Sequence, residues 1–339
     1  MKEITITSKE AGQRFDKYLG KYLEKAGKSF IYKMLRKKNI TLNGKKAEGS
    51  ERLNEGDTVK LFLADETIEK FSQEMPVELE HFNQIEKKQM LEMDKQEKEE
   101  LCIIYEDENV LIINKPAGML SQKARPDDIS LIEHITTYLL ESGQLTIEQM
   151  KGFRPGISNR LDRNTSGIIV AGKSLEGLQV MGELFKERTL DKYYYCIVKG
   201  VVEKKEQIEG YLYKNHSHNK VTISKEPQEG SEYIKTQYEP IKKTEEYTLL
   251  KVKLITGRSH QIRAHLQSIG HPIIGDGKYG DVRVNKYFKK NFKLKHQLLH
   301  AAELHFPKMK EGFEGLSNQV IKAPFPDYFE AIVDGVFRK

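Results

Sequence analysis

The stretch Arg160-Leu161-Asp162-Arg163-Asn164-Thr165-Ser166-Gly167 runs directly into the apolar segment Ile168-Ile169-Val170-Ala171. Its single carboxylate, Asp162, lies between two arginines. Asn, Thr, Ser and Gly favour a turn whose side chains bond to their own backbone, and the apolar segment favours a buried strand. We therefore predict a rigid loop that presents one carboxylate at the entrance of a strand. A purely structural ion pair explains these eight residues equally well.

The whole chain has 339 residues, which is enough for two domains or one large one. Charged residues make up 31% and the net charge is +6. No run approaches the roughly 18 apolar residues of a membrane span, and the first residues lack the apolar segment of a signal peptide. Two separate cysteines, Cys102 and Cys196, are predicted to be buried thiols and support neither a disulfide framework nor a Cys-based zinc site. We expect a cytoplasmic protein without a membrane partner.

Charge is unevenly distributed along the chain. Residues 1–65 carry 15 Lys and Arg against nine Asp and Glu, whereas residues 66–100 carry five against 11. The remaining residues are again net basic. Two basic blocks separated by an acidic spacer indicate two surfaces for one polyanion.

The first basic block predicts a small helical module. Residues 12–26 have the pattern of an amphipathic helix, and Ser29 is a candidate N-cap for a second helix. Asn43-Gly44 before Lys45-Lys46 is a hairpin signal, and a strand is predicted over 59–63.

This order of elements resembles the small RNA-binding domain named for ribosomal small-subunit protein four, also called the αL motif. The resemblance implies that residues 1–65 form this domain and that its second helix and hairpin hold RNA. The implied RNA-binding residues are Lys33, Arg36, Lys37, Asn43 and Lys45. A solvated basic face is the alternative interpretation. Phosphate contacts of this kind supply affinity and register rather than sequence choice.

Residues 66–100 are interpreted as a charged, partly helical linker. A second domain is predicted from 101 to 339. Its expected elements are a hairpin over 101–114, helices over 129–141 and after Ser174, a tyrosine-rich strand over 192–198, and an antiparallel meander over 207–255. Tyrosines of the 192–198 strand suit base stacking, although most tyrosines on a strand serve the core.

A second informative stretch, Thr256 to Leu266, follows the meander. Ser259 is predicted to cap a helix whose buried face includes Ile262 and Leu266. Arg263 adjoins that face, so it can reach inward to a buried carboxylate. The following loop, 270–280, is too rich in glycine to be a passive connection.

Four blocks occur in one order: Asn114-Lys115-Pro116-Ala117-Gly118, 160–167, 192–200, and 256–263 continuing to 270–273. They resemble the signature of pseudouridine synthases of the RluA/RluC/RluD type, and the layout is most similar to the RluC-like group. The resemblance covers nearly all of 101–339. It implies an α+β fold whose catalytic domain has a mixed, mainly antiparallel β-sheet flanked by helices and loops.

The same resemblance implies roles for six residues. The catalytic set is Asp162, Tyr194 and Arg263, and the substrate-binding set is Arg160, Arg163 and Leu254. Asp162 would attack the target uridine while Arg263 pairs with its carboxylate. Arg163 would fill the gap left by the flipped uridine, Tyr194 would stack on the base, and Leu254 would wall the pocket.

Two positions depart from the family pattern. Asn159 stands where members often have His, and Met119 to Lys123 replace the usual Leu-Leu-Val-His-Pro. No role is carried onto the second departure. The spacer over 66–100 is also longer than usual.

The implied reaction is an isomerisation, so we expect neither a cofactor nor a metal. Large-subunit ribosomal RNA is the expected substrate and transfer RNA the second choice, and we expect a monomer. The main rival is a non-catalytic RNA-binding ribosome assembly factor. A metalloenzyme using His216 and His218, or His260 and His265, is disfavoured by their spacing, and a serine hydrolase lacks its Gly-x-Ser-x-Gly elbow.

Overall fold

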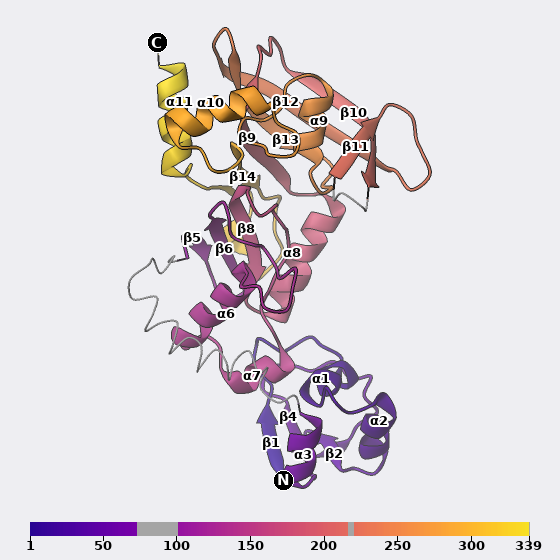
Figure 1. Ribbon diagram of the computed structural model, residues 1–339. Helices are drawn as coiled ribbons and strands as arrows, with labels where there is room; N and C mark the ends of the chain where they lie inside the picture. Colours follow the sequence, from indigo (N-terminus) through magenta and orange to yellow (C-terminus); the bar gives the residue numbers. More distant parts are fainter. Residues whose placement is uncertain (73–100, 216–219, 339) are drawn as a thin grey trace.

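The computed structural model describes residues 1–72, 101–215 and 220–338 (Figure 1). They form a small N-terminal unit and a larger unit, each with its own sheet. This confirms the α+β class, with a small unit followed by a mixed, mainly antiparallel sheet. The predictions for residues 73–100 and for His216 and His218 lie outside the described residues.

The N-terminal unit packs helices on one side of a small antiparallel sheet with strand order β1-β4-β2-β3. Its strands are β1 (Lys2–Thr5), β2 (Ile40–Leu42), β3 (Lys45–Lys46) and β4 (Thr58–Leu61). Its helices are α1 (Phe15–Tyr22), α2 (Lys28–Arg36) and α3 (Asp65–Phe71). One apolar core, which includes Phe15, Leu19 and Leu35, runs through the unit and takes in Ile68 of α3.

Local geometry in this unit agrees only in part with the predicted elements. The β2–β3 turn is the predicted hairpin, with positive φ at Asn43 and Gly44 as a type I′ turn requires. Helix α1 is shorter than predicted, and Gly27 rather than Ser29 is the N-cap of α2. Strand β1 was not predicted, because four alternating residues at the terminus give a weak signal.

The larger sheet has 11 strands among the described residues, with the main order β11-β10-β12-β13-β9-β14-β8-β6-β5. Its strands are β5 (Ile103–Glu106), β6 (Val110–Lys115), β7 (Gly156–Ile157), β8 (Ser166–Gly172), β9 (Asp191–Lys199), β10 (Glu206–Asn215), β11 (Lys220–Ser224), β12 (Glu232–Lys243), β13 (Tyr247–Leu254), β14 (Leu299–His305) and β15 (Val320–Lys322). The β8–β14 pair is parallel and the neighbouring pairs are antiparallel. The sheet is therefore mixed, and β8 lies between β14 and β6 toward one end of it.

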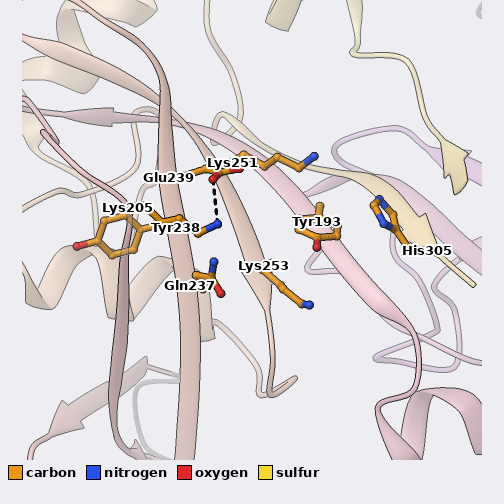
Figure 2. Close-up of a pocket in the computed structure, with 8 residues that line it drawn as sticks. All are labelled: Tyr193, Lys205, Gln237, Tyr238, Glu239, Lys251, Lys253 and His305. Atoms are coloured by element: carbon orange, nitrogen blue, oxygen red, sulfur yellow. Dashed lines mark ion pairs between the residues drawn. The ribbon is translucent and has the colours of Figure 1, made fainter. Parts of the chain in front are cut away.

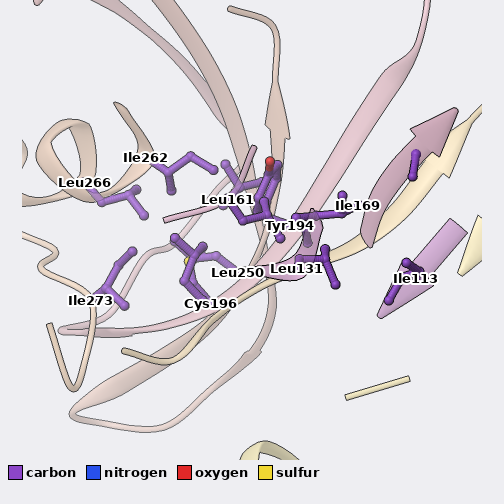
Figure 3. Close-up of a cluster of buried hydrophobic side chains, with 14 of the residues drawn as sticks. Ile113, Leu131, Leu161, Ile169, Tyr194, Cys196, Leu250, Ile262, Leu266 and Ile273 are labelled. Atoms are coloured by element: carbon purple, nitrogen blue, oxygen red, sulfur yellow. The ribbon is translucent and has the colours of Figure 1, made fainter. Parts of the chain in front are cut away.

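Helices cover both faces of this sheet. They are α6 (Leu131–Glu141), α7 (Ile147–Gly152), α8 (Leu175–Glu187), α9 (Gln261–Ser268), α10 (Val282–Phe292) and α11 (Asp327–Phe337). One face buries side chains of α6 and α9 against Ile169, Tyr194 and Leu250 (Figure 3). The other face buries α8 at one end and α10 with α11 at the other. Asp162 belongs to the first face, because its neighbour Leu161 is part of that core.

Several sequence predictions for this domain need correction. Helix α6 buries Leu131, Ile135 and Leu139, while Ile129 lies outside the helix and is exposed. His260, and not Ser259, is the N-cap of α9. Helices α7, α10 and α11 were not predicted, and Cys102 is exposed, unlike the buried Cys196.

The two units touch through α1 and α7. Glu148 on α7 accepts a hydrogen bond from Tyr22 and pairs with Lys2 at 2.9 Å. Gly152, at the end of α7, lies against Tyr18, so a Cβ placed there would be 2.4 Å from that ring. The described contacts therefore include a specific interface between the units.

Candidate active site

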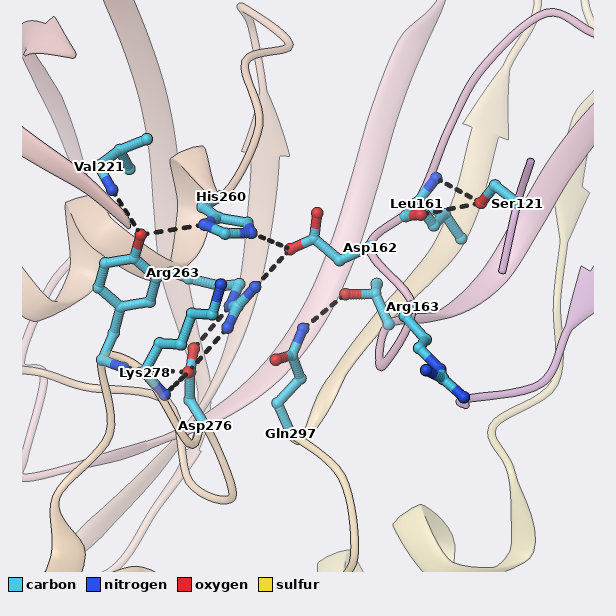
Figure 4. Close-up of polar contacts among 12 residues, drawn as sticks. Ser121, Leu161, Asp162, Arg163, Val221, His260, Arg263, Asp276, Lys278 and Gln297 are labelled. Carbon is cyan, nitrogen blue, oxygen red and sulfur yellow. Dashed lines mark hydrogen bonds and ion pairs between the residues drawn. The ribbon is translucent and has the colours of Figure 1, made fainter. Parts of the chain in front are cut away.

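The Asp162 loop is a tight turn at the entrance of β8. The Thr165 N–H donates to the Asp162 carbonyl at 3.0 Å, which closes the turn. Ser121 holds Leu161, the residue before Asp162, through two hydrogen bonds. The Ser121 hydroxyl donates to the Leu161 carbonyl at 2.8 Å and accepts from the Leu161 N–H at 3.1 Å (Figure 4). Gln297 donates to the Thr165 hydroxyl at 2.7 Å. Residues far away in the chain therefore hold the Asp162 turn through side-chain hydrogen bonds.

A buried lysine also bonds to the backbone of the same turn. Lys115 is fully buried, and its ammonium donates to the carbonyls of Pro116 at 2.8 Å, Met119 at 2.9 Å and Arg163 at 3.2 Å. A buried cation needs partners of this kind. The Lys-Pro-Ala-Gly block thus supports the backbone of the Asp162 loop.

Gly167 is required by the close approach of β14. Its φ is +117°, and a Cβ there would lie 2.2 Å from the Ala301 carbonyl oxygen. Ala301 is its partner in the parallel β8–β14 pair. The glycine that ends the predicted turn therefore lets β14 reach the site.

Asp162 is paired with Arg263, as the sequence predicted. The Arg263 Nη1 donates to Asp162 Oδ2 at 2.6 Å. The same guanidinium donates from Nε and Nη2 to Asp276, at 2.7 Å and 2.9 Å. Figure 4 shows the other Asp162 oxygen, Oδ1, pointing away from Arg263. One guanidinium therefore joins a partly exposed carboxylate to a fully buried one.

The electrostatics favour the charged forms of Asp276 and Arg263. Burial opposes the charge of Asp276, but Arg263 and the backbone N–H groups of Lys278 and Tyr279 outweigh it and keep the pKa of Asp276 below its ordinary value. Burial likewise opposes the charge of Arg263, yet Asp276 and then Asp162 raise the pKa of Arg263 above its ordinary value. Arg263 is thus a permanent cation beside Asp162.

His260 and Tyr279 form a second contact that the sequence did not indicate. His260 has a left-handed backbone, with φ of +58°, and its Nε2 is 3.8 Å from Asp162 Oδ2. Its Nδ1 is 3.0 Å from the Tyr279 hydroxyl, which accepts from the Val221 N–H at 2.8 Å. Burial, together with the charge of Arg263, lowers the pKa of His260 although Asp162 opposes this. A strained residue aimed at the carboxylate is a signal that only the structure provides.

Tyr194 and Leu254 belong to the apolar core beside the Asp162 loop. Tyr194 on β9 is buried in the same core as Leu161 (Figure 3). Leu254 at the end of β13 packs against that core. Burial, and then the charge of Asp162, raises the pKa of Tyr194 well above its ordinary value. Its hydroxyl is therefore protonated at neutral pH. The structure brings Asp162, Tyr194 and Arg263 together.

The predicted RNA-contacting arginines are exposed. Arg160 and Arg163 both face solvent, and Arg163 donates from Nε to the Gly118 carbonyl at 2.9 Å. In the hairpin, Asn43 uses its side chain within the unit, donating to Asp57 at 2.8 Å and accepting from the Thr58 N–H at 2.8 Å. The charged members of the predicted RNA-binding set, Lys33, Arg36, Lys37 and Lys45, are all exposed.

Asn159 replaces the usual histidine without disturbing the strand. Its amide donates to the Ile168 carbonyl at 3.0 Å and accepts from the Val170 N–H at 2.8 Å. The Asn159 amide thus forms both kinds of hydrogen bond that a neighbouring strand would form with the backbone of β8.

The two histidines of the disfavoured metal site, His260 and His265, have separate hydrogen-bond partners. His260 bonds to Tyr279, whereas His265 bonds to the Thr236 hydroxyl at 3.0 Å. Over residues 1–72, 101–215 and 220–338, no group of three His, Cys, Asp or Glu side chains could hold a metal ion. Within those same ranges, no helix is long and apolar enough to cross a membrane.

A surface pocket lies on the opposite face of the sheet, because Tyr193 lines it and neighbouring residues of a strand point to opposite faces (Figure 2). Its lysines are already neutralised. Lys205 pairs with Glu239 at 3.2 Å, and Lys251 pairs with Glu303 at 3.0 Å. This pocket is separate from the Asp162 site and offers little net charge to a ligand.

Comparison with known proteins identifies similar chains. Residues 109–268 match a family described as RNA pseudouridylate synthase. The chain is 31% identical to ribosomal large subunit pseudouridine synthase C of Vibrio cholerae serotype O1, over 89% of this chain and 88% of the relative. It is 29% identical to the protein of that name from Escherichia coli strain K12, over 90% and 88%. A solved structure, human RNA pseudouridylate synthase domain containing 4, has the same fold with a TM-score of 0.54 and 22% identity, covering 68% of this chain and 91% of that one.

Proposed function

The chain belongs to the RNA pseudouridylate synthase family, and on that premise we propose that it converts specific uridines of large-subunit ribosomal RNA to pseudouridine. Family membership makes it an isomerase that acts on RNA. The printed names of the relatives from Vibrio cholerae and Escherichia coli support the ribosomal substrate. We place the enzyme in the cytoplasm, as a monomer.

The observation that carries the proposal is the Asp162–Arg263 pair at 2.6 Å. A carboxylate nucleophile must be ionised, and a neighbouring guanidinium favours that form. The Asp162 side chain is 25% exposed, in contrast to the fully buried Asp276. Arg263 holds Oδ2, which leaves Oδ1 for the substrate.

The reaction conserves every atom. The bond from N1 of the base to C1′ of the ribose breaks, and a bond from C5 to C1′ forms. The proton leaves C5 and N1 gains one, so no oxidant or reductant takes part. Asp162 serves as the nucleophile, Arg263 holds its Oδ2, and Tyr194 and Leu254 hold the free base while it turns.

The target uridine must leave its helix to reach Asp162. Base flipping costs about a few kcal/mol. We propose that exposed Arg163 fills the gap in the RNA, with Arg160 beside it. The basic helix α2 and hairpin of residues 1–65 offset part of the cost through phosphate contacts, with Lys33, Arg36, Lys37 and Lys45 as the charged groups.

Tritium release from ribosomal RNA labelled at C5 of uridine tests this function. The wild-type enzyme should release tritium, and Asp162→Asn should bind the same RNA without releasing any. Asp127→Asn is the matched control, because that exposed residue undergoes the same chemical change outside the Asp162–Arg263–Asp276 cluster. Full turnover by Asp162→Asn would remove the assignment of the nucleophile. Mapping pseudouridines in cells with and without the gene tests the substrate, and a loss confined to transfer RNA would refute the ribosomal choice.

A further inference from the structure

Helix α10 and the turn after it form a strongly basic segment. Residues 282–298 contain six Lys and Arg and no Asp or Glu. All six are exposed, and none makes an ion pair with any residue in the described ranges. We call them the α10 cations: Arg283, Lys286, Lys289, Lys290, Lys293 and Lys295.

The other side of α10 is firmly attached to the protein. Phe288 is fully buried and stacks on Phe292, with ring centroids 5.2 Å apart. Both belong to a core that α11 completes with Phe329 and Ile332. The cations therefore project from a rigid element.

Both ends of the segment are tied to the candidate active site. Near its start, Asn285 accepts from the Gly275 N–H at 2.7 Å and donates to the Asp276 carbonyl at 2.9 Å. Asp276 in turn holds Arg263. At its end, Gln297 donates to the Thr165 hydroxyl in the Asp162 turn at 2.7 Å. The basic segment thus starts and finishes at the loops that form the site.

We propose that the α10 cations bind the phosphate backbone of the RNA that flanks the target uridine. This inference rests on the proposed function, and it adds a surface to the N-terminal unit already assigned to RNA. Unpaired cations on a fixed helix attract a polyanion because binding releases its counterions. The acidic residue nearest to the helix, Asp281, is neutralised by Lys199 at 2.7 Å.

RNA fits this surface better than an anionic membrane does. A helix that lies on a membrane inserts its apolar face among the lipids. In α10 both phenylalanines, Phe288 and Phe292, are turned toward the protein, and the exposed apolar side chains Val282 and Tyr287 lie among the cations.

The placement of α10 gives the RNA a second point of attachment. Figure 1 shows α10 and the N-terminal unit toward opposite ends of the protein, with β8 between them. An RNA held at both places would pass the turn that presents Asp162. Loss of the α10 cations should therefore weaken binding without changing the chemistry at Asp162.

The test removes three charges from the middle of the helix. The variant Lys286→Gln/Lys289→Gln/Lys290→Gln is compared with Lys186→Gln/Lys225→Gln/Lys242→Gln, which neutralises three exposed lysines elsewhere. Both are placed in the Asp162→Asn background, and affinity for a ribosomal RNA fragment is measured across a salt series. The α10 variant should bind on the order of tenfold more weakly. The slope of log affinity against log salt should fall by about three for three lost phosphate contacts.

The active enzyme provides the second readout. Without the Asp162→Asn change, the α10 variant should show a raised KM with kcat within about twofold of wild type, since binding rather than chemistry is lost. If the wild-type enzyme modifies no RNA, the proposed function fails, whereas the change in salt slope would still support RNA binding by α10.

Three results would overturn the proposal. The α10 variant could bind RNA as tightly as the control variant does. It could lose binding to vesicles of phosphatidylcholine and phosphatidylserine while keeping its affinity for RNA. If circular dichroism shows that the triple variant is unfolded, the double variant Lys293→Gln/Lys295→Gln, whose residues follow the helix, is measured instead. A salt slope of this double variant equal to that of the wild type is the third result that would overturn the proposal.

Discussion

Asp276 accepts two hydrogen bonds from Arg263, at 2.7 Å from Nε and 2.9 Å from Nη2. Its side chain is fully buried, so substrate cannot reach it. Asp276 therefore fixes the orientation of the Arg263 guanidinium on the side away from Asp162, and Asp162 is bonded by Nη1. A fixed donor of this kind keeps the carboxylate in one orientation before substrate arrives.

Asp276→Asn should impair both stability and catalysis. The amide cannot accept both guanidinium hydrogen bonds, and breaking a buried ion pair costs roughly 3–5 kcal/mol of unfolding free energy. We expect kcat to fall on the order of 10- to 100-fold with little change in KM, because Arg263 is then loosely held. Urea unfolding and tritium-release kinetics measure the two effects. A variant with normal kcat would show that Asp276 does not position Arg263 for catalysis.

Gly167→Ala should be severely destabilising. The new methyl group would meet the Ala301 backbone at 2.2 Å, and φ of +117° is unfavourable for alanine. Overpacking and backbone strain together cost roughly 3 kcal/mol or more. Gly182→Ala on α8 is the control, because nothing lies within 4 Å of a Cβ there. That change should stabilise by about 0.5–1 kcal/mol, and equal melting temperatures for the two variants would contradict the argument.

Acidification should destabilise the fold through two buried histidines. Burial lowers the pKa of His265 and of His300 to about 4, from an ordinary value of 6.5. Both are therefore neutral in the folded state down to that pH, while the unfolded chain takes up protons below about 6.5. Stability is lost progressively as pH falls from about 6.5 to about 4, by roughly 3–4 kcal/mol for the pair at pH 5.

Denaturant unfolding at a series of pH values measures this slope. His300→Gln should flatten it, since glutamine does not titrate. His300 accepts from the Ser166 hydroxyl at 2.9 Å and donates to the Ala323 carbonyl at 3.3 Å. The substitution will therefore also lower stability at neutral pH. An unchanged slope between pH 6.5 and 4 would mean that the buried imidazoles are not responsible.

Gly152→Leu should separate the two units. A side chain at Gly152 would push into Tyr18 on α1, where a Cβ alone lies at 2.4 Å. Small-angle X-ray scattering should then show a larger radius of gyration, with the catalytic domain still folded. Gly20→Ala, on α1 but with no atom within 4 Å, should leave the scattering unchanged. Identical curves for wild type and Gly152→Leu would show that these contacts do not fix the units in solution.

The sequence predicted the parts of the site that depend on local pattern. Turn residues around Asp162 and the helical spacing of Ile262 and Leu266 were sufficient for the loop and for an inward-facing Arg263. Asp276 was missed, although the sequence indicated that its loop was unusual. Its role depends on a fold-back that brings residue 276 beside residue 263, and no local pattern encodes that.

Supporting residues were missed for the same reason. Ser121 and Gln297 each hold the Asp162 turn from more than 35 residues away, by single side-chain hydrogen bonds. Helix α10 was overlooked because its charges dominate the composition, while its apolar positions meet α11, another element that was not predicted. The exposure of Cys102 likewise depends on where the strand begins, a boundary that propensity locates poorly.

The parallel β8–β14 pair has a consequence for synthesis of the chain. The strand behind Asp162 gains this neighbour only when residues 299–305 have been made, whereas the N-terminal unit closes its own core by residue 68. Domains fold in order as they emerge from the ribosome. A nascent chain would therefore complete the core of its N-terminal unit well before β14 can join the sheet behind Asp162.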